Sequence, residues 1–181
     1  MDGLIIRVDD VSENTNHYDL EKSCEFLNRE IGAKIIWCIN LYSKRANGSV
    51  YPDLPLKDKS LEYLCDVDQG YVRTRPSWID VASHGLIHAK HGELSRDAQL
   101  ISIKTSCSML RTYKFAPPFM SYNEDTKDIC FQNGIELIDG IGWKSMESEP
   151  LDKDHRLWYF HQWRMDYRRV VDWVHGSQVV A

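Results

Sequence analysis

Three groups of polar residues in this sequence have types and spacings that suit metal-assisted chemistry. Asp9 and Asp10 are adjacent carboxylates, and His84 and His88 are imidazoles four residues apart, the spacing of a single helical turn. Two imidazoles and one carboxylate can hold a divalent cation and leave coordination positions open for water and substrate. His161 ends an aromatic run, and a histidine can donate a proton near neutral pH. The second carboxylate of the Asp pair can face water or substrate.

Each group also has a simpler interpretation when it is taken alone. Adjacent Asp residues are common in turns and helix caps, and an isolated histidine is more often a satisfied core side chain. His91 lies shortly after the histidine pair and is a rival ligand. Gly85 occupies the position where a zinc peptidase's His-Glu-x-x-His would carry its Glu, so peptidase chemistry is not expected.

Two other classes of protein stay open at this point. An iron(II) oxygenase also binds its metal through two histidines and a carboxylate. Such sites usually place the carboxylate close to the first histidine, whereas Asp10 is far from His84 in this sequence. A structural or interaction protein is the other alternative, and it requires all these polar groups to be coincidental.

The segments around these residues alternate between strands and helices. Apolar runs predict strands, periodic apolar positions predict helices, and Asp19 and Asn123 are candidate helix caps. Such alternation predicts an α/β fold with a parallel sheet, either open or closed into a barrel, whose reactive residues gather at the carboxyl ends of the strands. We expect strands at 4–8, 33–41, 78–83, 113–116, 135–138 and 157–160, and helices at 19–31, 95–110, 123–133 and 165–174.

The segment at about 43–77 is polar and contains several prolines. It is too long for a plain connection in a compact domain, and we interpret it as an insertion or lid. With 181 residues, the chain is predicted to form a single domain over 1–181.

Composition limits the partners and the compartment. The net charge of −5 gives no reason to expect nucleic acid or an anionic membrane as partner. No apolar run is long enough for a transmembrane segment, and the first residues lack the pattern of a signal peptide. The five cysteines form no CxxC pair and are expected to be buried free thiols. We therefore expect a cytoplasmic protein.

In this order, the motifs resemble those of the polysaccharide deacetylases of carbohydrate esterase family 4. Their NodB-like domain is a distorted, incomplete (β/α) barrel. The stretch Arg-Val-Asp-Asp-Val at 7–11 resembles the family's Thr-Phe-Asp-Asp-Gly. The resemblance implies that Asp9 is the general base and Asp10 a metal ligand. His84 and His88 match the two ligands of the His-Ser/Thr-x-x-His motif.

Three further stretches carry the resemblance toward the end of the chain. Phe-Ala-Pro-Pro-Phe at 115–119 is similar to Phe-Arg-Pro-Pro-Tyr, with Ala116 in place of the arginine that pairs with the base. Asp139 follows a strand like that of the fourth motif, whose Asp orients the catalytic histidine. Tyr-Phe-His at 159–161 resembles Leu-x-His, which implies that His161 is the general acid. Arg7, Arg73 and Arg75 are candidates to compensate for the missing arginine.

The function implied by the resemblance is metal-dependent removal of N-acetyl or O-acetyl groups from a sugar or a surface-polysaccharide precursor. Zinc is the default metal, and iron, cobalt, nickel or manganese would bind the same ligands. The missing signal peptide favours an intracellular sugar intermediate as substrate. The alternative is a catalytically impaired carbohydrate-binding protein of the same fold, and Ala116 favours it.

Overall fold

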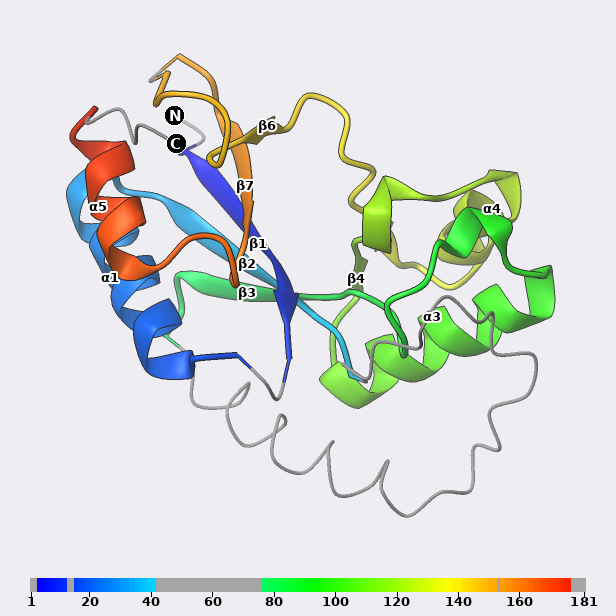
Figure 1. Ribbon diagram of the computed structural model, residues 1–181. Coiled ribbons are helices and arrows are strands. Elements are labelled where there is room, and N and C mark those ends of the chain that lie inside the picture. The colour runs from blue at the N-terminus through cyan, green and yellow to red at the C-terminus, as the bar shows by residue number, and fades with distance from the viewer. Residues whose placement is uncertain (1–2, 13–14, 42–75, 153, 177–181) are drawn as a thin grey trace. The chain divides into compact units, whose positions relative to one another are not determined.

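The computed structural model describes residues 3–12, 15–41, 76–152 and 154–176 (Figure 1). The insertion or lid expected at 43–77 lies outside these residues, except for its last two positions. The strands form a seven-stranded sheet in the order β5-β4-β3-β2-β1-β7-β6. Contacts divide the chain into two compact units. Unit 1 comprises Met1–Trp37, Pro76–Asp80 and Ile141–Ala181, and unit 2 comprises Cys38–Arg75 and Val81–Gly140.

Most of the observed elements match those expected from the sequence. The strands are β1 (Ile5–Val11), β2 (Lys34–Ile39), β3 (Ile79–Ser83), β4 (Lys114–Phe115), β5 (Glu136–Leu137), β6 (Lys144–Ser145) and β7 (Leu157–His161). The α-helices are α1 (His17–Ile31), α3 (Arg96–Leu110), α4 (Glu124–Gln132) and α5 (Tyr167–Val174), and the 3-10 helices are η1 (His91–Glu93) and η2 (Pro118–Met120). Strand β6 was not predicted, because its two residues, Lys144 and Ser145, are polar and form no apolar run.

In unit 1, the parallel strands β1 and β7 have one apolar and one polar face. Ile6 and Val8 pair with Trp158 and Phe160 in the register, and all four side chains are fully buried. The Trp158 ring lies 5.0 Å from that of Trp173 in α5, so this face packs toward the helices. Figure 1 shows α5 beside α1. Because side chains alternate along a strand, Arg7, Asp9, Tyr159 and His161 share the other face.

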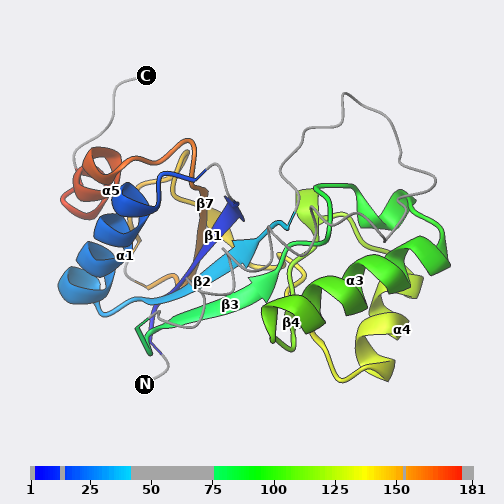
Figure 2. The ribbon, with the colours of Figure 1, turned by 90° about the horizontal axis from the view of Figure 1, so that it is seen from below.

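In unit 2, the parallel strands β3, β4 and β5 are accompanied by α3 and α4, which lie side by side in Figure 2. Asn123 caps α4, as predicted, and forms a capping box with Thr126. The apolar core of this unit consists of Ile103, Cys107, Phe115, Ile129, Cys130 and Ile135.

The cysteines of the described residues are Cys24, Cys38, Cys107 and Cys130, and all four are free and buried. This confirms the prediction of buried free thiols for them, and Cys65 lies outside the described residues. Among the described helices, none has the length and apolar character needed to cross a membrane.

Candidate metal and catalytic site

Asp9 forms a buried ion pair with Arg7 on β1. Nη2 of Arg7 donates to Oδ2 of Asp9 at 2.9 Å, and Nε lies 2.8 Å from Oδ1. Only 2% of the arginine side chain and 6% of the aspartate side chain are exposed. The two residues are two positions apart on one strand, so their side chains point to the same face. The predicted base is thus a carboxylate held at both of its oxygens by one guanidinium.

The next residue, Asp10, has an unusual backbone conformation. Its φ is 63°, in the left-handed region that few residues other than glycine adopt. Such conformations persist where the surrounding structure imposes them, and they cluster at functional sites. The indole Nε1 of Trp163 donates to Oδ2 of Asp10 at 2.9 Å. A hydrogen bond of this kind orients a carboxylate that is a candidate metal ligand.

His161, at the end of β7, is held by a carboxylate that the sequence analysis missed. Its Nδ1 lies 2.7 Å from Oε1 of Glu147, and its backbone N–H donates to the same oxygen at 2.7 Å. Nη1 of Arg164 donates to the other carboxylate oxygen at 3.1 Å. Glu147 follows the two-residue strand β6, which has no sequence signal that would have marked it.

The pKa values of this pair move in the directions expected for an ion pair. Burial lowers the pKa of His161, but the hydrogen bond and the negative charge of Glu147 outweigh it, so that the pKa lies above histidine's ordinary value. Burial raises the pKa of Glu147, but the hydrogen bonds from His161 outweigh it, and the pKa lies below the ordinary value. The pair therefore favours a protonated imidazole beside an ionised carboxylate.

Asp139, the residue to which the resemblance assigns this orienting role, follows β5 in unit 2 and is partly exposed. Its charge contributes to raising the pKa of Lys127, after the larger effect of Glu124. In unit 1, the carboxylate that contacts His161 is that of Glu147. An interaction of Asp139 with His161 stays a prediction.

His84 and His88 lie in a loop after β3 and not on the helical turn suggested by their spacing. Gly85 has a φ of 89°, a conformation that ends the strand and suits glycine. The two imidazole rings nevertheless lie close, with centroids 5.3 Å apart. Nδ1 of buried His84 donates to the carbonyl of Ala116 at 2.7 Å. This fixes the tautomer in which Nε2 carries the lone pair that a metal needs.

His91, the rival ligand, is fully buried with both ring nitrogens occupied. Nδ1 donates to the carbonyl of Ala89 at 3.0 Å, so Nε2 is the acceptor of its 2.9 Å contact with the Ser102 hydroxyl. Burial lowers the pKa of His91 to about 4, which keeps the ring neutral. These contacts give His91 a structural role.

The same ring explains why glycine stands at position 85. A Cβ there would lie 2.7 Å from Cε1 of His91 and 2.9 Å from the carbonyl oxygen of Ile87. The serine or threonine of the family motif would not fit this loop as it stands. The buried ring of His91 therefore accounts for glycine at position 85, where the family motif has serine or threonine.

The loop that begins with Ala116 contributes to the surroundings of His88. Phe119 has a φ of 58°, and its ring, 60% exposed, lies 4.4 Å from that of His88. An exposed aromatic ring beside a candidate metal ligand offers an apolar surface to a substrate.

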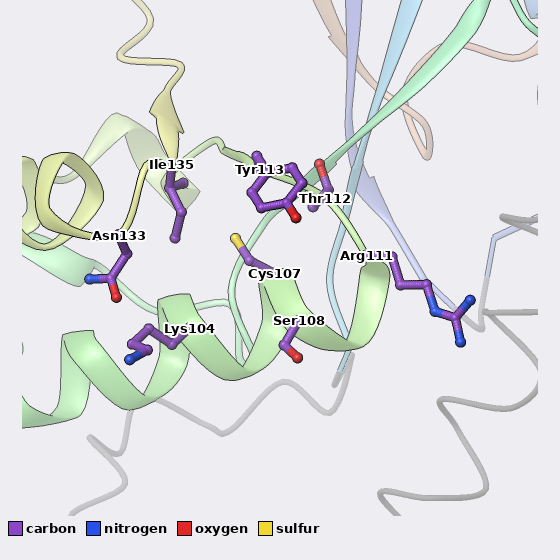
Figure 3. A pocket seen from close by; sticks show the side chains of 8 residues that line it. All are labelled: Lys104, Cys107, Ser108, Arg111, Thr112, Tyr113, Asn133 and Ile135. Atoms are coloured by element: carbon purple, nitrogen blue, oxygen red, sulfur yellow. The ribbon is translucent and has the colours of Figure 1, made fainter.

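A pocket of about 470 Å³ lies elsewhere in unit 2 (Figure 3). Thr112 and Tyr113, which line it, precede β4, whereas Ala116 follows that strand, so the pocket lies at the amino end of β4. Its lining includes none of the predicted catalytic or metal-binding residues. Burial raises the pKa of its Cys107 thiol to about 12, which makes that thiol unreactive.

The fold is that of family 4 carbohydrate esterases. The family 4 carbohydrate esterase from Streptomyces lividans, solved in complex with acetate, covers 98% of this chain and 87% of its own at a TM-score of 0.64 and 12% identity. The peptidoglycan deacetylase PdaC from Bacillus subtilis covers 97% of this chain and 81% of its own, at a TM-score of 0.59 and 12% identity. A pseudoenzyme of the same family from Bacillus anthracis has a TM-score of 0.61 and 12% identity over 88% of this chain and 55% of its own.

These likenesses confirm the predicted fold class, a distorted, incomplete (β/α) barrel of the polysaccharide deacetylase type. No protein-family model matches the sequence, and no curated protein is significantly similar to it. Proteins with this fold include deacetylases and a pseudoenzyme, so activity must be argued from the residues of this chain.

Proposed function

We propose that this protein is a metal-dependent hydrolase that removes acetyl groups from an acetylated amino sugar. The observation that carries the proposal is the register of β1 and β7. Asp9, the proposed base, pairs with His161, the proposed acid, and both side chains are on the polar face of unit 1. A hydrolase of this type needs one group to accept a proton from water and another to return a proton to the leaving group.

The chemistry of the donor set supports a divalent metal. The proposed ligands are Asp10 of unit 1 and His84 and His88 of unit 2, and one carboxylate with two imidazoles suits zinc. Within unit 2, the Ala116 carbonyl sets the tautomer of His84, and within unit 1, Trp163 orients Asp10. A bound cation would polarise the acetyl carbonyl and lower the pKa of bound water. Zinc is our first choice, and iron, cobalt, nickel and manganese are to be compared with it.

Asp9 then accepts the proton of the attacking water. The Nδ1–H of His161 donates to Glu147, which raises the pKa of the ring, so the protonated imidazole also carries a proton at Nε2 and gives it to the departing amine. Acetate and a free amino sugar are the products. Glu147 is our candidate for the residue that orients His161, and Asp139 is the candidate from the resemblance.

A second function is favoured by a specific observation. Ala116 carries no charge where active relatives are expected to have an arginine, and one protein of this fold is a pseudoenzyme. The alternative is therefore a carbohydrate-binding protein without turnover. Both functions require an acetylated sugar as ligand.

The test is acetate release by the full chain reconstituted separately with Zn²⁺, Fe²⁺, Co²⁺, Ni²⁺ and Mn²⁺. The substrate panel should contain N-acetylglucosamine oligomers, N-acetylated nucleotide sugars and O-acetylated oligosaccharides. Metal-dependent acetate release that Asp9→Asn abolishes supports the hydrolase. Stoichiometric metal and sugar binding without acetate release from any member of the panel supports the pseudoenzyme.

A further inference from the structure

We propose that Arg7 is a positioning residue that fixes the orientation of the Asp9 carboxylate for the reaction. The inference rests on the proposed function, because it concerns the base of that reaction. Its starting point is the burial of Arg7, which is only 1% exposed. Burying a guanidinium costs several kcal/mol unless a partner of opposite charge and further contacts compensate.

The partner of Arg7 is the Asp9 carboxylate, and the contact is at two points. Nη2 lies 2.9 Å from Oδ2 and Nε lies 2.8 Å from Oδ1. The Nη2–Oδ2 contact is a hydrogen bond, and the Nε–Oδ1 contact is an ion-pair approach without hydrogen-bond geometry. Two contacts between the same charged groups restrict the rotation of the carboxylate more than a single contact does. Each carboxylate oxygen has two lone pairs, so an oxygen that binds Arg7 can still accept a proton from water.

The guanidinium of Arg7 is itself held by two aromatic rings, those of Trp143 and Tyr159. Cζ of Arg7 lies 5.0 Å from the ring centroid of Trp143 and 5.4 Å from that of Tyr159. Both distances are within the range of cation–π attraction. Tyr159 is also the residue that pairs with Arg7 in the parallel register, so this contact follows from the pairing of β1 with β7.

The arrangement links the proposed base to the proposed acid through backbone pairing. Arg7 pairs with Tyr159, and Asp9 pairs with His161 one step further along the same two strands. When the orientation of the Asp9 carboxylate is fixed relative to the paired strands β1 and β7, its orientation relative to His161 is fixed as well. The position of a reacting group matters, since a displacement of about 1 Å can lower a rate on the order of 100-fold.

The test compares Arg7→Lys and Arg7→Ala with a matched variant, Arg96→Lys. Arg96 is a half-exposed arginine that also pairs with carboxylates, those of Asp125 and Asp128, but it is on α3. Lysine keeps the charge at position 7 but cannot make the two-point contact. We expect Arg7→Lys to lower kcat about 10- to 100-fold with KM and metal content nearly unchanged. Arg96→Lys should retain full kcat.

Chemical rescue separates positioning from a merely structural role. Guanidinium at a concentration that does not unfold the protein should restore part of kcat to Arg7→Ala and should not affect Arg7→Lys. Thermal melts select the variants that are folded. A folded Arg7→Lys protein with wild-type kcat would overturn the proposal, and so would a folded Arg7→Ala protein without any rescue.

A measurement without turnover keeps this inference distinct from the proposed function. If the wild-type protein releases no acetate, the proposed function fails. The orientation of Asp9 is then compared in crystal structures of the wild-type and Arg7→Lys proteins. A rotated Asp9 carboxylate in the variant supports positioning by Arg7, and an unchanged one overturns it.

Discussion

Oε1 of Glu147 accepts two hydrogen bonds from a single residue, one from the backbone N–H of His161 and one from its ring Nδ1, each at 2.7 Å. Arg164 binds the other oxygen of the same carboxylate. The ring of His161 is thereby oriented with Nε2 as the nitrogen that can exchange a proton with a substrate. Glu147 itself has little freedom, with only 12% of its side chain exposed.

The first prediction concerns the pH dependence of turnover. A general acid must be protonated, so activity falls as pH rises through the pKa of His161, which Glu147 raises. Glu147→Gln removes this effect, and the alkaline limb of the kcat/KM profile should move to lower pH. The control is Glu149→Gln, which removes a nearby carboxylate paired only loosely with Lys144, at 3.8 Å. An alkaline limb that stays in place in Glu147→Gln would contradict the assignment.

The second prediction separates metal binding from the proton transfer. Asp9→Asn should keep the metal and lose turnover by at least about 100-fold, because the amide cannot accept the proton of water. His84→Ala should lose both the metal and the activity, because a ligand is removed. Metal content by atomic emission and acetate release are measured on the same samples. Full activity in Asp9→Asn would show that another residue is the base.

A third prediction concerns the hydrogen bond to Asp10. Trp163→Phe keeps a ring but removes the indole N–H, and metal affinity should fall about tenfold. Competition with a coloured chelator measures the affinity. Trp173→Phe is the matched control, because its indole N–H donates to the carbonyl of Glu149 and not to a proposed ligand. Equal metal affinity in the two variants would mean that Trp163 does not orient Asp10.

The fourth prediction is that Gly85→Ser destabilises the fold, although it restores the hydroxyl of the family motif. The new Cβ meets His91 and Ile87, and the φ of 89° is unfavourable for serine. We expect a loss of about 2–4 kcal/mol in the free energy of unfolding, measured with urea. Gly134→Ser is the control, since Gly134 has a φ of 64° and no atom within 4 Å of its Cβ position. Gly134→Ser should lower the free energy of unfolding by only about 1–2 kcal/mol.

The fifth prediction is acid sensitivity caused by His91. Its pKa of about 4 in the folded state lies below histidine's ordinary value of about 6.5, so the unfolded chain binds the extra proton first. The stability contribution of the neutral ring is complete above pH ~6.5 and is lost as pH falls toward 4, by on the order of 3 kcal/mol. His91→Gln should flatten this part of a stability–pH curve obtained by urea unfolding. An equally steep decline in the variant would assign the acid sensitivity to other groups.

Local sequence patterns predicted most of the fold. Helix α4 begins after its Asn123 cap, as expected, whereas α1 begins at His17 after the cap Asn16, so the predicted cap Asp19 was wrong by one turn. Caps and apolar periods are properties of neighbouring residues, so they can be read without knowledge of the tertiary structure. The short strand β6 has neither a cap nor a period, and it was missed together with Glu147.

By itself, the sequence determined the residue types of the candidate site and their places at strand ends. It indicated Asp9 and His161 as proton carriers and Asp10, His84 and His88 as ligands, roles that remain predictions. Only the tertiary structure showed which charged side chain forms an ion pair with which carboxylate. Arg7, Arg73 and Arg75 were equivalent candidates in sequence. Arg7 contacts Asp9, and Arg73 and Arg75 lie outside the described residues. The physical reason is that an ion pair depends on side-chain direction and burial, which only the packed strands β1 and β7 establish.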